Sequence, residues 1–123
     1  PYLTALENVL LPTLATRDED DLHRATDLMR ALAIEHRAHH FPHELSAGER
    51  QRCALARALQ GKPDVILADE PTGNLDKESA NLVLSMLRDC RDNGATVLVV
   101  SHHHIDTIPK DVEFVLRDGK LQF

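Results

Sequence analysis

The sequence has few aromatic residues, no excess of positive charge and no long apolar run, and each of these shortages excludes a kind of core or a class of protein. It has no Trp and only 3% aromatic residues, so any core must be aliphatic. A net charge of -6, with histidine neutral, argues against a nucleic-acid binder that works by neutralising phosphates. No apolar run approaches the roughly 20 residues that cross a bilayer, and no signal peptide is visible. The two cysteines, Cys53 and Cys90, lie in apolar helical patterns and favour buried thiols in a reducing compartment.

The sequence also lacks G-x-x-x-x-G-K-[ST], the loop whose backbone N–H groups cradle the phosphates of a nucleotide. Its 123 residues allow one domain or part of one, and they begin with Pro1 rather than Met. The first residue is consistent with an excised or processed product. The chain is therefore without the loop that would hold a nucleotide of its own.

Helical patterns occupy the first 45 residues. Thr4 and Glu7 form a capping box, and Pro12 should end or kink the helix that follows. A second helix is predicted over residues 18–34, with an acidic start that suits the helix dipole. Its inner stripe would consist of Leu22, Ala25, Leu28 and Leu32. Residues 35–44 have the composition of a loop, with Pro42 and four histidines: His36, His39, His40 and His43.

Helical and strand patterns alternate along the rest of the chain. A capping box at Ser46 and Glu49 predicts a helix that runs to about Gln60. Residues 65–68 and 96–100 are short apolar runs typical of buried parallel strands, and Asp76 can cap a helix over residues 77–92 between them. A helical turn is expected over residues 104–108. Residues 112–116 and 121–123, around an Asp-Gly turn, predict a hairpin. The fold class is therefore α/β: a helical front, a parallel-sheet βαβ unit and a C-terminal β-hairpin.

Two stretches carry the candidate chemistry. Ser46 and small residues stand at the start of a helix, where free backbone N–H groups can meet a phosphate. The strand over residues 65–68 ends in Asp69 and Glu70, and carboxylates at this edge of a parallel sheet can hold a metal ion and a water molecule. An Asp-Glu pair is also common in ordinary strand-end loops, so taken alone it is only moderate evidence for such a site.

In this order and this close together, the two stretches resemble motifs of ABC-type ATPases. Leu45-Ser46-Ala47-Gly48-Glu49 resembles the signature motif, and Val65-Ile66-Leu67-Ala68-Asp69-Glu70 resembles the Walker B strand. Pro71-Thr72-Gly73-Asn74-Leu75-Asp76 resembles the D-loop, in a form typical of lipoprotein-release and macrolide-export transporters, and Ser101-His102 resembles the switch histidine. The resemblance covers nearly the whole chain. It implies a helical subdomain over residues 1–45 and the C-terminal part of the ATPase core over residues 46–123.

This resemblance implies a partial P-loop NTPase domain and a role for each motif residue. Asp69 would hold Mg²⁺ through water, and Glu70 would polarise the attacking water or accept its proton. His102 would contact the γ-phosphate of ATP and orient the water. The remaining expected site residues would serve the ATP held by the opposite subunit, or the dimer interface beside it: Ser46, Ala47, Gly48, Glu49 and Asp76.

The signature motif departs from the family's usual L-S-G-G-Q at two positions. Ala47 adds a methyl group where the backbone must approach phosphate closely. Glu49 fits the capping box but brings a negative charge near phosphate. We expect these changes to weaken the motif rather than abolish its function.

The function expected from the resemblance is that of the C-terminal part of an ATP-hydrolysing subunit. The whole domain would hydrolyse ATP with Mg²⁺ at an interface with a second ATPase subunit. It would drive export or release of a substrate through an inner-membrane permease, from the cytoplasmic side and without nucleic acid. Lacking the P-loop and the Q-loop, this chain alone is expected to be inactive. In the family a P-loop strand lies between residues 96–100 and 112–116, so we expect the gap to close by rearrangement or in a strand-swapped oligomer.

Two other functions are weighed against this one. A non-catalytic, truncated interaction module could dock on a permease or on an intact ATPase subunit. A soluble ATPase of the DNA-repair type fits less well, because the helical front is short and the charge is acidic. The four clustered histidines have spacings that could ligate a metal. No cysteine or carboxylate completes an obvious set, however, so solvated loop histidines are the default.

Overall fold

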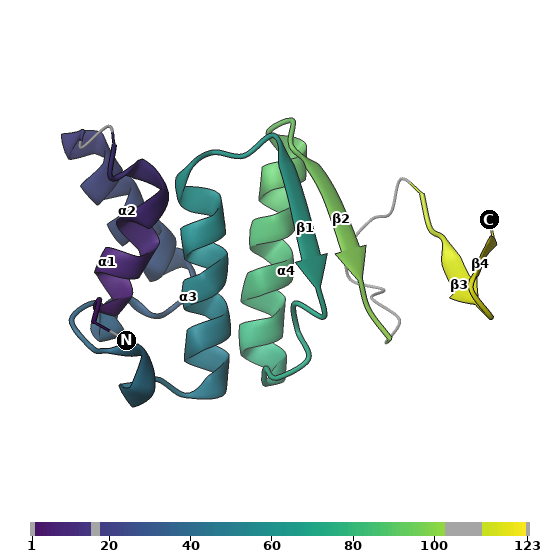
Figure 1. The fold of residues 1–123 in the computed structure, drawn as a ribbon, viewed down its shortest axis with the longest axis horizontal. Helices are drawn as coiled ribbons and strands as arrows, with labels where there is room; N and C mark the ends of the chain where they lie inside the picture. Colours follow the sequence, from purple (N-terminus) through teal and green to yellow (C-terminus); the bar gives the residue numbers. More distant parts are fainter. Residues whose placement is uncertain (1, 16–17, 103–111, 123) are drawn as a thin grey trace.

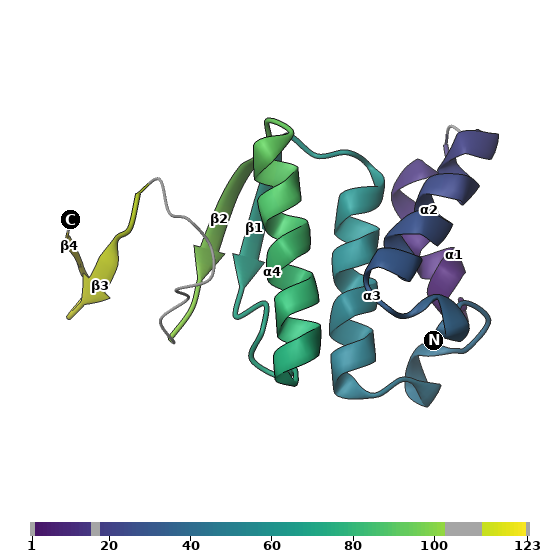
Figure 2. The same cartoon turned by 180° about the vertical axis from the view of Figure 1, so that it is seen from behind.

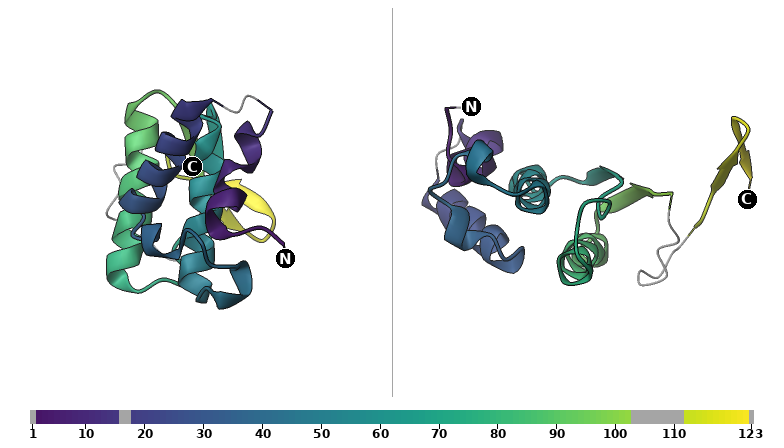
Figure 3. Two further views of the ribbon diagram at one scale, coloured as in Figure 1. Left: turned by 90° about the vertical axis from the view of Figure 1, so that its left-hand side faces the viewer. Right: turned by 90° about the horizontal axis from the view of Figure 1, so that it is seen from below.

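The computed structural model of the chain describes residues 2–15, 18–102 and 112–122. In chain order the elements are α1 (Ala5–Leu10), the 3₁₀ turn η1 (Leu11–Thr13), α2 (Glu19–Ala31), the 3₁₀ turns η2 (Glu35–Arg37) and η3 (Pro42–Glu44), α3 (Ala47–Gln60), β1 (Val65–Asp69), α4 (Lys77–Asp92), β2 (Thr96–Val100), β3 (Val115–Arg117) and β4 (Lys120–Gln122). Figure 1 shows α1 and α2 at one end, α3 in the middle, and α4 beside β1 and β2. The view from below in Figure 3 shows the same succession of layers, ending in the β3–β4 hairpin.

The start and end of α1 confirm the prediction from its capping residues. Thr4 N–H donates to Glu7 Oε2 at 2.7 Å, and Glu7 N–H donates to Thr4 Oγ1 at 3.3 Å. This reciprocal pair satisfies backbone donors that the first turn leaves free. The α-helix ends at Leu10, and Pro12 lies in the 3₁₀ turn that follows.

Helix α2 ends at Ala31, earlier than the predicted Ile34. Ala33 adopts a left-handed conformation, with φ of 54°. The N–H of Ile34 then donates to Met29 O at 2.8 Å, a backbone pattern that closes a helix. Ile34 is buried, so this turn directs the chain back toward the core. The segment predicted as a loop contains two single 3₁₀ turns, η2 and η3.

The core is aliphatic, as the shortage of aromatic residues predicts. Its largest fully buried hydrophobic side chains are Val9, Met29, Leu32, Ile34, Leu59, Val83 and Leu87. The predicted inner stripe of α2 is confirmed at Ala25, Leu28 and Leu32 but is wrong at Leu22, which is 49% exposed.

Strands β1 and β2 form a two-stranded parallel sheet, in register from Val65 opposite Thr96 to Asp69 opposite Val100. Helix α4 covers one face of this sheet (Figure 2). Because successive side chains point to opposite faces, Ile66 is buried while Leu67 is 75% exposed. The prediction of fully buried strands is therefore correct for one face only. The uncovered face presents Val65, Leu67, Leu98 and Val100.

The C-terminal hairpin is confirmed, but its first strand is shorter than the predicted 112–116 and its second begins one residue earlier than predicted. Strands β3 and β4 pair around Asp118 and Gly119, whose φ angles of 49° and 74° match the two-residue turns that suit hairpins. They form a sheet of their own, and in the described part of the chain β2 and β3 do not pair. Closure of the expected gap by pairing of these two strands is thus not seen. The turn predicted over residues 104–108, and Phe123, lie outside the described residues.

We predict that Leu59→Ala lowers the free energy of unfolding by about 2–5 kcal/mol, because Leu59 is fully buried and its truncation leaves a cavity. The matched change Leu22→Ala removes an exposed side chain and should cost about 0.5 kcal/mol. Urea unfolding followed by circular dichroism measures both. Equal losses would contradict the burial that the structure assigns to these two leucines.

Candidate functional site

The predicted site residues gather at one end of the molecule, where β1 and β2 end and α3 and α4 begin (Figure 1). Each helix runs antiparallel to the strand that follows it, so helix starts and strand ends share an edge. In open α/β folds ligands bind outside the carboxyl ends of the strands. The structure therefore brings Ser46, Glu70, Asp76 and His102 to the same edge of the sheet.

The start of α3 keeps two backbone donors free. Ser46 is the N-cap: Glu49 N–H donates to Ser46 Oγ at 3.1 Å, and Ser46 N–H donates to Glu49 Oε2 at 2.8 Å. This confirms the predicted capping box. Within the described residues the N–H groups of Ala47 and Gly48 have no hydrogen-bond partner, as expected for the first positions of a helix. Such groups can bind an anion.

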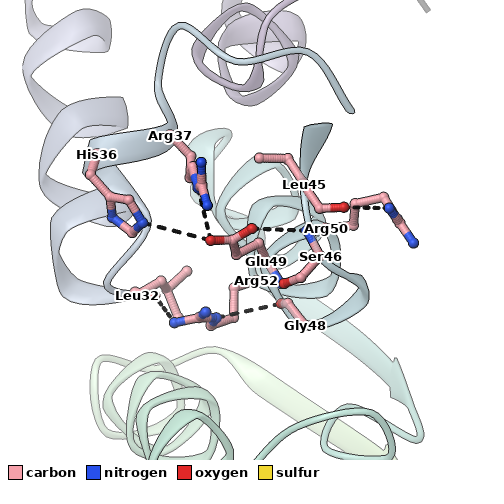
Figure 4. A network of polar contacts seen from close by, with 9 residues as sticks. All are labelled: Leu32, His36, Arg37, Leu45, Ser46, Gly48, Glu49, Arg50 and Arg52. Atoms are coloured by element: carbon pink, nitrogen blue, oxygen red, sulfur yellow. Dashed lines mark hydrogen bonds and ion pairs between the residues drawn. The ribbon is translucent and has the colours of Figure 1, made fainter. Parts of the chain in front are cut away.

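The carboxylate of Glu49 is turned toward η2 and is bound there. Figure 4 shows Arg37 and His36 converging on it; Arg37 Nε lies 2.9 Å from Glu49 Oε1, and His36 Nε2 lies 3.6 Å from the same oxygen. The hydrogen bond from the Ser46 backbone, aided by Arg37 and opposed by burial, lowers the pKa of Glu49 to about 2. Glu49 is thus ionised and paired at neutral pH. Its predicted contact with ATP stays a prediction.

Neighbouring atoms leave little room for a side chain at Gly48. A Cβ atom at this position would lie 3.1 Å from Leu75 Cδ2 and 3.5 Å from Asn74 O. Any side chain here would force Leu75 to move. Close packing of Gly48 against the loop after β1 therefore joins the start of α3 to the approach to α4.

Glu70 is held in an unusual conformation directly after β1. Its φ is 45°, a left-handed value that is strained for a residue with a side chain. Its N–H donates to Val100 O at 2.8 Å. Its carboxylate accepts a hydrogen bond from His102 N–H at 2.6 Å and one from the Ser101 hydroxyl at 3.3 Å. These bonds place the carboxylate across the ends of both strands.

Gln51 also belongs to this site, although the sequence did not predict it. Its side-chain N–H donates to Glu70 O at 3.0 Å, and Gly73 N–H donates to the same carbonyl at 3.1 Å. Gln51 therefore links α3 to the strained residue after β1. No local signal could reveal this bond, because 19 residues separate its partners.

Asp69, Asp76 and His102 complete the set. Asp69 is exposed at the end of β1, and its carboxylate oxygens are the hard ligands that Mg²⁺ prefers. Asp76 caps α4 as predicted, and hydrogen bonds from the hydroxyl and N–H groups of Ser79 lower its pKa. The His102 side chain is 91% exposed, with Nε2 3.7 Å from Glu70 Oε1.

The clustered histidines form no metal site in the part of the chain that the structure describes, where no three histidine, cysteine or acidic side chains converge. Two of the four have other contacts. His36 lies against Glu49, and the ring of His43 stacks on Phe41 with centroids 5.9 Å apart.

A parallel strand–helix–strand unit, with carboxylates and helix starts at the carboxyl ends of its strands, is typical of α/β domains of the nucleotide-binding class. The model of the family described as ABC transporter matches residues 1–73. The chain belongs to this family.

Relatives and solved structures agree with this assignment. The chain is 46% identical to lipoprotein-releasing system ATP-binding protein LolD 1 of Rhodopirellula baltica, over 98% of this chain and 54% of the relative. It is 43% identical to the lipoprotein-releasing system ATP-binding protein LolD of Shewanella frigidimarina, over 99% of this chain and 52% of the relative. The dimeric, ADP- and phosphate-bound ATP-binding cassette MJ0796 aligns with a TM-score of 0.76 and 40% identity, over 84% of this chain and 47% of that one.

The chain thus spans about half the length of these relatives. Its fold is that of part of an ATP-binding cassette, which confirms the predicted fold class. None of the helices in the described ranges has both the length and the hydrophobicity needed to cross a bilayer.

We predict that Glu49→Gln makes the chain less stable at neutral pH, by about 2 kcal/mol, because a neutral Gln accepts a weaker hydrogen bond from the Ser46 N–H and cannot pair as a charge with Arg37. The pKa of Glu49 falls on folding from 4.5 to about 2, so the contribution is complete above pH 4.5 and is lost as the pH falls toward 2. The two chains should therefore converge in stability on acidification. Urea unfolding at pH 7, 5, 4 and 3 measures this, and a constant difference would contradict it.

Proposed function

We propose that this chain is the C-terminal part of the ATP-hydrolysing subunit of an ABC transporter. The observation that carries the proposal is the meeting of the start of α3, the Asp69–Glu70 strand end and His102 at one edge of the sheet. The proposed ligands are ATP and Mg²⁺. The relatives named for a lipoprotein-releasing system support a transporter of the release or export type.

Glu70 is the proposed general base. Its carboxylate is fixed by the His102 N–H and by Ser101, and it is partly exposed, so it can still accept a hydrogen bond from a water molecule. The exposed imidazole of His102 lies beside it and would contact the terminal phosphate. Asp69 would hold Mg²⁺ through water, and the ion would neutralise the phosphate charge.

The start of α3 is proposed to serve the nucleotide of a second subunit. Ser46 and the free N–H groups of Ala47 and Gly48 would meet its terminal phosphate, with Glu49 completing the turn. Asp76, at the start of α4, would lie in the dimer interface. The dimeric state of the MJ0796 cassette supports this arrangement.

The chain is proposed to act only together with a P-loop-containing half. Support comes from the uncovered face of the β1–β2 sheet, since parallel sheets are normally covered on both faces. The greater length of the relatives agrees with this. We further propose docking on an inner-membrane permease from the cytoplasmic side.

The test is calorimetric titration of the chain with Mg-ATP, alone and mixed with a P-loop-containing N-terminal half. We expect no tight binding of Mg-ATP by the chain alone and hydrolysis by the mixture. Glu70→Gln should lower turnover by about a hundredfold or more, because it removes the general base. Tight binding by the chain alone would overturn the proposal.

The matched control is Glu19→Gln, the same chemical change on the exposed first turn of α2. It should leave turnover unchanged. Equal loss in both variants, or no loss with Glu70→Gln, would contradict the role given to Glu70.

A further inference from the structure

The acidic residue in the first turn of α3 poses an electrostatic problem. A helix start attracts an anion through free N–H groups and the positive end of the helix dipole. Glu49 sits at the third helical position, in the same first turn as the free N–H groups of Ala47 and Gly48, and its ionised carboxylate would repel a phosphate there. The repulsion would be strong, because the Glu49 side chain is only 11% exposed and water screens it poorly.

Arg37 is placed to cancel this charge. It reaches from η2 and donates from Nε to Glu49 Oε1 at 2.9 Å, while the other oxygen, Oε2, accepts the Ser46 N–H at 2.8 Å (Figure 4). One carboxylate oxygen of Glu49 thus binds the guanidinium of Arg37, and the other binds the N–H of the N-cap residue Ser46. Arg37 itself is about one-third exposed, so the pair is partly withdrawn from solvent.

A second arginine holds the same two segments together. Arg52, one turn further along α3, donates to Leu32 O, at the end of α2, at 3.0 Å. It also approaches Gly48 O at 3.4 Å. The path from α2 to η2 is therefore fixed against the first turn of α3, and Arg37 has a defined position rather than a chance encounter with Glu49.

We propose that Arg37 is a positioning residue that neutralises Glu49 and so keeps the start of α3 able to receive a phosphate. The inference rests on the proposed function, because it assumes a phosphate at this helix start. Arg37 acts through Glu49 and does not touch the nucleotide. In this arrangement a signature motif that contains Glu49 can still receive a phosphate, because Arg37, which precedes the motif in the chain, supplies the opposite charge.

The test separates charge from packing by using Gln at position 49. Gln keeps the capping hydrogen bonds without the charge. The full chain, labelled with ¹⁵N, is titrated with sodium tripolyphosphate, and the amide shifts of Ala47 and Gly48 give the affinity. Arg37→Ala should weaken binding about tenfold. The double variant Arg37→Ala/Glu49→Gln should recover to within about twofold of the original chain.

The control is Arg91→Ala, which removes an ion pair with Asp92 at 2.7 Å in the last turn of α4. It should not change the affinity. An Arg37→Ala chain that binds as before overturns the inference, and so does a loss that Gln at position 49 fails to rescue, since that loss would be structural.

Turnover by the mixture with the P-loop-containing half keeps the two proposals distinguishable. If mixtures made with the original chain and with the Arg37→Ala chain hydrolyse ATP at the same rate, the inference is overturned and the proposed function is not. Amides that do not respond to tripolyphosphate in the original chain also overturn the inference. Absence of hydrolysis in the mixture overturns the proposed function.

Discussion

Helix α3 is anchored by hydrogen bonds at both of its ends, and the rest of the structure depends on this anchoring. At its start, Ser46 and Glu49 bond reciprocally. At its end, Arg24 donates to Leu59 O at 2.9 Å and to Gln60 O at 3.1 Å. With both ends fixed, the helix packs against α1, α2 and α4 and supplies core residues to each layer. The same anchoring sets the position of its first turn at the edge where β1 ends.

The β1–β2 sheet and α4 are sufficient to assemble the edge at which the strands end. Two parallel strands and α4 bring Glu70 and His102 together. The strain at Glu70 is balanced by hydrogen bonds that Gln51 and Gly73 donate to its carbonyl oxygen and by one that its own N–H donates to Val100 O. The opposite face of the sheet is open and apolar. The unit therefore combines an assembled polar edge with an apolar face that no other layer covers, in agreement with a chain that spans about half the length of its relatives.

Much of the fold could be predicted because its signals are local. Capping boxes at Thr4 and Ser46, the break at Pro12 and the Asp118–Gly119 turn depend on neighbours within a few residues, and each is confirmed. Exposure of Leu22 and one-sided burial of the strands could not be predicted, because periodicity shows which side chains share a face and not whether another layer covers it. The contacts of Gln51 and Arg37 join residues 19 and 12 positions apart.

The sequence by itself determined the family, the order of helices and strands, and the identity of the motif residues, because all of these lie in short runs with their own chemistry. Only the tertiary structure decided how those residues are held. It turned the Glu49 carboxylate toward Arg37, and it tied Glu70 to Gln51 and to the end of β2. The physical reason is that hydrogen bonds and ion pairs depend on distance in space. Side chains far apart in the sequence meet only after the helices pack.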